Sequence, residues 1–204
     1  MSDAPEAEPD GNMLAIHEAG HLVVGVLVGR RPIKVSLDQV DGRRGCFWEL
    51  ETECGWDDFS EMRSLIAGPR AQVVLLPHSV APEKLDLFQA RIIQPSPSLW
   101  QLPKGVYDFT GWQHDVVPVH EYLAMPNAPA DANLPLGTTR SQVVNRAEEV
   151  LLNFFVIKEV QRATERIAAI LLHARSLDTT DADHIVRQEG DLWKSLSEGV
   201  LAWK

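Results

Sequence analysis

Cysteine is scarce in this chain, which contains only Cys46 and Cys54 among its 204 residues. Two cysteines are too few for a disulfide framework, and their spacing lacks the CxxC pattern of metal and redox motifs. A disulfide across a hairpin stays open, but free thiols in a reducing cytosol are the expected state. The cysteine content therefore argues against a disulfide-stabilised fold.

Basic residues are also few, since 19 Lys and Arg against 29 Asp and Glu give a formal net charge of -10. No basic stripe that could grip a phosphate backbone is present, so nucleic acid is not an expected partner. The apolar stretch 13–28 is too short for a membrane span and carries three ionisable groups. The first ten residues lack the basic region of a signal peptide. We therefore expect a cytoplasmic protein without a membrane anchor.

The expected organisation is a disordered acidic tail over residues 1–11, followed by one domain over residues 12–204. The chain is 45% hydrophobic, which suffices for a core. The fold class is predicted to be mainly α (α+β), with a small β-hairpin or sheet. Periodicity, capping residues and breakers predict helices at about 11–29, 58–76, 84–93, 114–125, 140–174, 181–188 and 191–202.

A hairpin is predicted from the alternating segments 33–37 and 46–51, which flank the turn signal Asp41-Gly42. A strand beside a metal-binding helix often holds the substrate of a zinc peptidase in extended form by backbone pairing. This hairpin is the candidate for that task, and an ordinary covering sheet is the alternative. Within the helix at 58–76, Gly68-Pro69 predicts a kink or a break into two helices.

His17, Glu18 and His21 form an HExxH sequence inside a run that is apolar on nearly every side. On a helix the two histidines lie one turn apart on the same face, so both imidazoles can reach one metal ion. Glu18 lies beside that site, where it can act as a base toward a metal-bound water. Buried histidine and glutamate are costly unless they are paired or bound to metal, so the pattern favours a metal site. Gly20 fits a close approach of metal or substrate, and it fits simple helix packing equally well.

A catalytic zinc usually takes three protein ligands and a water, so a third ligand is needed. The extended HExxHxxGxxH pattern is excluded, because Val24 and Leu27 stand where its glycine and third histidine would be. Glu61, on the second predicted helix, and Asp115, farther along the chain, remain as candidates.

Several segments resemble, in order, the peptidase domain of FtsH-type AAA+ metalloproteases. AIHEAGHLVVGVLVG (15–29) contains the HEAGH box characteristic of that family, and LIAGPRAQVVLL (65–76) is similar to its second helix. Pro69 and Gln72 depart from the AGR-A-E pattern of that helix. TGWQHD (110–115) resembles the stretch that bears the family's third zinc ligand, an aspartate, and residues 167–186 resemble its closing helices. The resemblance covers roughly residues 12–188 and implies a helical, zincin-like fold.

Carried over to this chain, the resemblance implies that His17, His21 and Asp115 bind Zn²⁺ and that Glu18 is the general base. It thus implies a zinc metalloendopeptidase that hydrolyses peptide bonds. Pro118 requires a helix start nearby, so Asp115 is also well placed as a helix cap, and the two roles are compatible.

Two further histidines lie close to Asp115 in the sequence. His114 is the alternative candidate to Asp115 for the position of third ligand. His120 is a surface residue or lies behind the ligands.

The family's ATPase has no counterpart here, because the chain contains no GxxxxGK[ST] phosphate loop. The protein then cleaves peptides or unfolded proteins unaided, works with a separate ATPase chain, or is a catalytically silent zinc-binding adaptor that keeps the peptidase fold. A metal-free helical interaction protein, with Trp112, Trp193 and Trp203 as partner contacts, is a third interpretation. The resemblance suggests a homo-oligomeric ring, while a dimer or monomer stays open.

Overall fold

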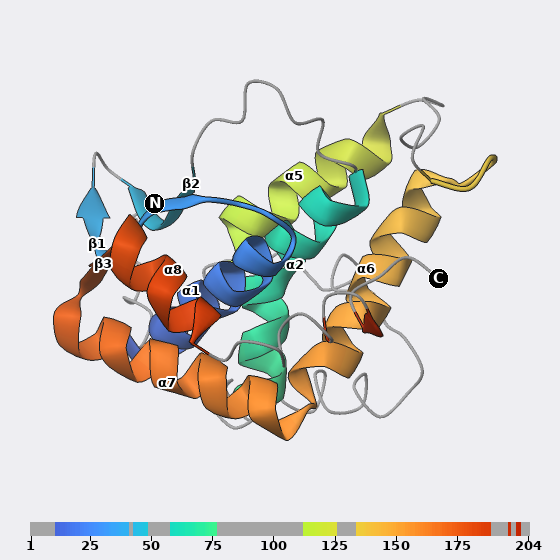
Figure 1. The fold of residues 1–204 in the computed structure, drawn as a ribbon. Coiled ribbons are helices and arrows are strands. Elements are labelled where there is room, and N and C mark those ends of the chain that lie inside the picture. Colours follow the sequence, from blue (N-terminus) through green and yellow to red (C-terminus); the bar gives the residue numbers. More distant parts are fainter. Residues whose placement is uncertain are drawn as a thin grey trace, which may run out of the picture.

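The computed structural model describes residues 11–40, 43–48, 58–76, 112–125 and 134–188, together with residues 196, 199 and 200. The described helices are α1 (Gly11–Leu27), α2 (Asp58–Leu75), α5 (Gln113–Ala124), α6 (Arg140–Phe155), α7 (Lys158–Ala174) and α8 (Thr179–Arg187) (Figure 1). The described strands are β1 (Pro32–Val40), β2 (Arg43–Trp48) and β3 (Ser176–Asp178). The fold is mainly helical with one small antiparallel sheet, which confirms the predicted α+β class.

Several predicted features lie outside the described residues. They are the tail at 1–10, the turn Asp41-Gly42, Cys54, the helix at 84–93, Trp193, Trp203 and nearly all of the helix at 191–202. In the part of the chain that is described, no helix combines the length and the apolar character needed to cross a bilayer.

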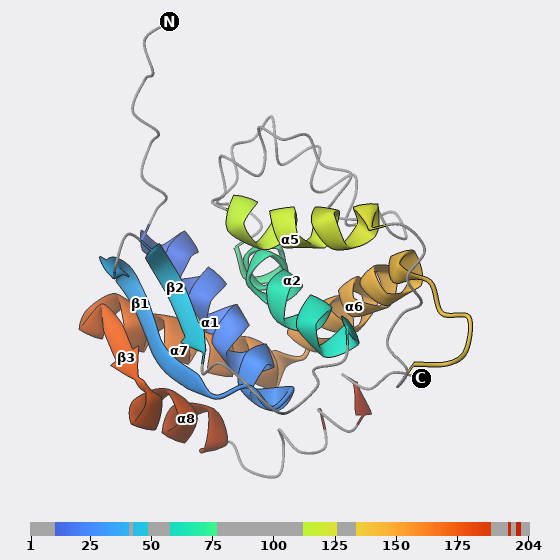
Figure 2. The same cartoon turned by 90° about the horizontal axis from the view of Figure 1, so that it is seen from above.

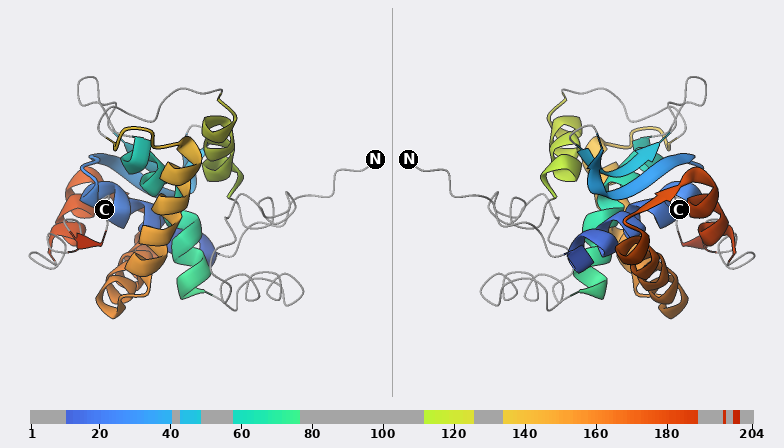
Figure 3. Two further views of the ribbon diagram at one scale, coloured as in Figure 1. Left: turned by 90° about the vertical axis from the view of Figure 1, so that its right-hand side faces the viewer. Right: turned by 90° about the vertical axis from the view of Figure 1, so that its left-hand side faces the viewer.

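Helix α1 lies at the centre of the molecule, with the sheet on one side of it and α2 on the other (Figure 2). Figures 1 and 3 show the sheet and α5 above α1 and α7 below it. The α1–α2 contact is close, because a Cβ atom at Gly20 would lie 2.6 Å from Cβ of Ala71 and 2.8 Å from the carbonyl oxygen of Ala67. Helix packing therefore explains Gly20.

The sheet has the order β2-β1-β3. The predicted hairpin is present, since β1 pairs antiparallel with β2 and Val35 lies opposite Cys46. The third strand, β3, was not predicted. It has only three residues, and it follows α7 directly after Arg175, whose φ of 64° ends the helix in the left-handed region.

The prediction of one long helix over 140–174 is wrong. Helix α6 ends at Phe155, and α7 begins at Lys158 after Ile157 adopts an extended backbone with ψ of 123°. Neither glycine nor proline stands at this break. The chain bends because α6 packs on α2 whereas α7 packs on α1, which lies in a different direction (Figure 1).

Of the kink or break predicted at Gly68-Pro69, the break into two helices does not occur, because α2 continues through Pro69 as a single helix. A proline inside a helix removes one backbone hydrogen bond, which weakens the helix locally. Packing compensates for that loss, since α2 lies between α1 and α6. The buried pair of Arg70 and Glu148, with Nη2 and Oε1 2.8 Å apart, fixes α2 to α6.

Candidate metal centre

Helix α1 places three polar side chains of the HExxH sequence in the interior. His17, Glu18 and His21 are exposed by only 5%, 5% and 7%. The two imidazoles meet edge to face, with ring centroids 4.6 Å apart and planes at 77°. The helical spacing thus brings both rings to one point, as the sequence predicts.

Helix α5 adds the carboxylate of Asp115 to this point. Its Oδ2 lies 2.9 Å from Nε2 of His17, and its Oδ1 lies 3.2 Å from Nε2 of His21. The ligand atoms that the three residues offer all lie within 4.8 Å of one another. Asp115 is in the first turn of α5, while the cap position belongs to Trp112. The cluster of His17, His21 and Asp115 could therefore hold a metal ion.

Hydrogen bonds on the far sides of the rings indicate which ring nitrogens carry protons. Nδ1 of His17 lies 3.0 Å from Oε1 of Gln72, and Nδ1 of His21 lies 2.8 Å from the carbonyl oxygen of Ser64. Both partners are acceptors, so each Nδ1 is the donor. In the neutral rings each Nε2 then presents a lone pair, and these two atoms face each other at 3.0 Å. Two nitrogen lone pairs and a carboxylate at such distances repel one another unless a cation or protons lie between them, so this donor set fits a metal ion.

The charges within the cluster shift its pKa values strongly. Burial alone would raise the pKa of Asp115, but His21 and His17 lower it well below its usual range. Burial alone would lower the pKa of His21, but the charge and hydrogen bond of Asp115, with Glu18, raise it to about 9. These shifts favour an ion pair between protonated His21 and ionised Asp115 when no metal ion is bound.

Glu18 lies beside the cluster and is not held by it. Its Oε2 is buried without a hydrogen-bond partner among the described residues. Burial raises the pKa of Glu18, and the two histidines only partly oppose this. Strand β2 passes close by, because a Cβ atom at Gly45 would lie 3.3 Å from that Oε2. The thiol of Cys46 donates to the backbone oxygen of Glu18 at 3.4 Å.

Two residues that border the cluster were not recognised in the sequence as part of a site. A Cβ atom at Gly68 would overlap Nε2 of His21 and lie 2.9 Å from Cδ2 of His17. The pattern at Gly68-Pro69 indicated a kink or a break in the helix, whereas this glycine makes room for the imidazoles. Gln72 stood out only as a departure from the family pattern, and its side chain orients His17.

The other candidates do not join the cluster. Glu61, His114 and His120 are exposed. Trp112 is almost fully buried, with 1% exposure, so its predicted role as a surface partner contact is wrong.

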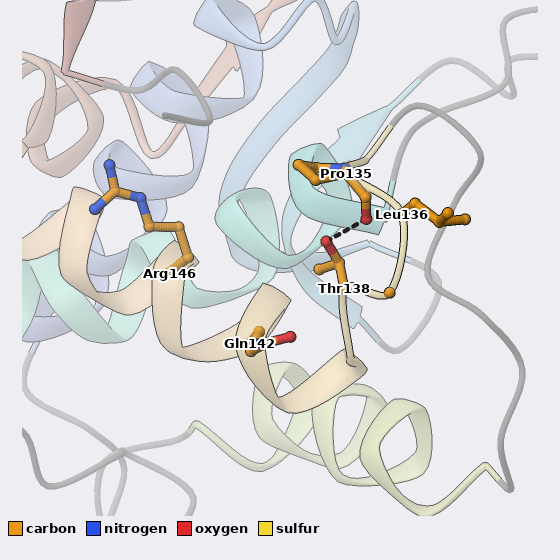
Figure 4. Close-up of a pocket in the computed structure, with 6 residues that line it drawn as sticks. Pro135, Leu136, Thr138, Gln142 and Arg146 are labelled. Atoms are coloured by element: carbon orange, nitrogen blue, oxygen red, sulfur yellow. Dashed lines mark hydrogen bonds between the residues drawn. The ribbon is translucent and has the colours of Figure 1, made fainter.

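A separate surface pocket of about 320 Å³ lies at the start of α6 (Figure 4). Its lining residues are Pro135, Leu136, Gly137, Thr138, Gln142 and Arg146. Thr138 Oγ1 donates to the carbonyl of Pro135 at 2.6 Å, and the Gln142 side chain accepts from the backbone of Thr139. These bonds close the loop and cap α6, and none of the metal-cluster residues lines this pocket.

No protein-family model matches the chain, and no curated protein matches it either.

Proposed function

We propose that the protein is a zinc-dependent metallopeptidase, with His17, His21 and Asp115 as the zinc ligands and Glu18 as the general base. The observation that carries this proposal is the buried Oε2 of Glu18, which has no hydrogen-bond partner among the described residues and lies next to a converging set of two imidazoles and one carboxylate. A site that binds zinc only for stability has no use for such a carboxylate, which costs free energy to bury.

Two imidazoles and one carboxylate also suit Fe(II), so the donor set alone does not choose the metal. The glutamate next to the first histidine favours zinc, because HExxH pairs two ligands with a base for hydrolysis. A zinc ion in this site supplies Lewis acidity and lowers the pKa of water toward about 7.

Glu18 provides the proton transfer that hydrolysis requires. Its Oε2 accepts a proton from the attacking water and later delivers that proton to the leaving amine. Burial supports this cycle, because a raised pKa lets the carboxyl group hold the proton between the two steps.

The sheet suits a peptide as the substrate. In the described sheet β2 is at the end of the order β2-β1-β3, so only one of its edges pairs with β1. Gly45 of β2 lies next to Glu18. An extended peptide would pair with the other edge of β2 through backbone hydrogen bonds. It would then run past Glu18, the proposed base. Unfolded chains and peptides can adopt this extended form, and a separate ATPase chain would be needed for folded substrates.

The first test is the metal content of the purified full chain, measured by elemental mass spectrometry for wild type, Asp115→Ala and Glu61→Ala. We expect one zinc per chain in wild type and in the exposed-residue control Glu61→Ala, as a single catalytic site requires. Asp115→Ala should lose the zinc. Iron in place of zinc, or no metal after reconstitution, would contradict the proposal.

The second test is hydrolysis of casein and of unstructured fluorogenic peptides by the zinc-loaded chain. Cleavage that stops on chelation and returns with zinc supports a peptidase. Full zinc occupancy without cleavage of any such substrate would instead favour the catalytically silent zinc-binding adaptor.

A further inference from the structure

Gln72 lies at the centre of a buried hydrogen-bond network that joins three helices. Its side chain is only 5% exposed. Its Oε1 accepts hydrogen bonds from Nδ1 of His17, at 3.0 Å, and from the indole Nε1 of Trp112. Its Nε2 donates to the carbonyl oxygen of Met13 at 2.9 Å. The amide of this α2 residue therefore contacts α1 twice and also the residue that caps α5.

Trp112 connects this amide to the third member of the metal cluster. Its backbone carbonyl accepts a hydrogen bond from the N–H of Asp115 at 3.0 Å. Its indole is enclosed in the core, with 1% exposure. A displacement of Trp112 would therefore move the turn that carries Asp115.

The two histidines differ in what orients them. His21 donates to the backbone carbonyl of Ser64, an acceptor that no side-chain substitution removes. His17 depends on the side chain of Gln72. Ser60, one turn before Ser64 on α2, accepts a buried hydrogen bond through its Oγ from Nη2 of Arg63 at 2.8 Å. This bond makes Ser60 a matched control on the same helix.

We propose that Gln72 is a positioning residue that brings the imidazole of His17 and the Asp115-bearing turn of α5 to the same metal ion. The inference rests on the zinc site of the proposed function. The amide acts on both sides of the cluster at once: it fixes the tautomer and ring plane of His17, and it anchors Trp112. Hydrogen-bond partners behind metal ligands typically change metal affinity by about 10–100-fold when they are lost.

The test measures zinc affinity of the full chain by competition with a chromophoric chelator. Gln72→Met keeps the length of the side chain but offers no strong acceptor, so it should bind zinc roughly 10–100-fold more weakly. Gln72→Glu keeps an acceptor for His17 and Trp112 but loses the donor to the carbonyl of Met13, so its affinity should fall less than that of Gln72→Met. Ser60→Ala loses a buried side-chain hydrogen bond on the same helix but touches neither histidine, so its affinity should stay unchanged.

A spectroscopic measurement separates positioning from a general loss of stability. Imidazole ¹⁵N NMR of the metal-free chain should show a population of the other His17 tautomer in Gln72→Met, while the His21 signals stay the same. If Gln72→Met does not fold, Trp112→Phe replaces it as the affinity test. It removes the indole N–H that bonds Gln72 while Gln72 still accepts from His17, and it should also weaken zinc binding.

Three outcomes overturn the inference while leaving the zinc site in place. They are wild-type affinity in Gln72→Met, wild-type affinity in Trp112→Phe, and a loss in Gln72→Glu as large as the loss in Gln72→Met. A wild-type chain that binds no zinc has a different meaning, since it refutes the proposed function itself.

Discussion

A side chain at Gly68 would overlap Nε2 of His21, because α2 passes very close to the imidazoles of α1. It would also crowd Cδ2 of His17, at 2.9 Å from the added Cβ atom. The rings cannot simply withdraw, since Gln72 and the carbonyl of Ser64 hold their Nδ1 atoms. The backbone of α2 thus forms one wall of the cluster.

Gly68→Ala should therefore weaken zinc binding by roughly tenfold or more, because overpacking of this kind costs about 1–3 kcal/mol. The matched control is Gly11→Ala at the start of α1. The nearest atom to its new Cβ would be Cδ2 of Leu172 at 3.8 Å, an ordinary contact. Chelator competition compares the two variants with wild type, and equal affinities in all three proteins would contradict the expected clash.

Glu18→Gln should keep the zinc and lose the activity. Glutamine has nearly the same shape as glutamate, but it cannot accept the proton of the attacking water. Removal of a general base typically lowers the rate by about 10²–10⁴-fold. Zinc content and kcat on a fluorogenic peptide are measured on the same sample, so that a change of metal occupancy is excluded. Retained hydrolysis at full occupancy would refute the role of Glu18 as the base.

The HExxH part of the candidate site is predictable from the sequence because its geometry is local. A spacing of four residues on a helix places His17 and His21 on one face whatever the rest of the chain does. Asp115 is distant in sequence, and only the family resemblance selected it over Glu61. The structure places Asp115 against both histidines and leaves Glu61 exposed.

Features that depend on contacts between helices could not be read from the sequence. The role of Gln72 requires that α2 packs on α1 with this residue opposite His17, and no periodicity of α2 encodes that register. The break at Ile157 is similar, because apolar residues continue at helical spacing on both sides of it. What divides that segment is the packing of α6 and α7 on different partners.

Removal of the metal should loosen α5 more than α6. Asp115 ties α5 to the two histidines of α1, and a bound ion would make that tie stronger. Zinc at about 100 times its Kd stabilises the folded chain by about 2.7 kcal/mol. Chelation should therefore lower the Tm and accelerate amide exchange of residues 113–124. Hydrogen–deuterium exchange with mass spectrometry measures the exchange rates. Asp115→Ala serves as the control, since chelation should leave its exchange rates unchanged; equal effects of chelation on both proteins would contradict a metal tie at Asp115.

The stability of the metal-free chain should fall as the pH rises. The charges of Asp115 and Glu18 outweigh burial and raise the pKa of His21 from 6.5 to about 9. Protonated His21 therefore stabilises the folded chain, and this contribution is complete below pH 6.5. It is lost as the pH rises through about 9 and His21 loses its proton. Asp115 has a lowered pKa, so its contribution is lost only in acid and does not change in this window.

Urea unfolding with a chelator present, from pH 6.5 to about pH 10, checks this expectation. Asp115→Asn removes the main charge that raises the pKa of His21, so its stability should change much less over the same range. With saturating zinc the direction should reverse, because zinc binds only the unprotonated Nε2 atoms and its stabilisation grows as protons leave. Parallel pH profiles of the two metal-free proteins would contradict the ion pair of His21 and Asp115.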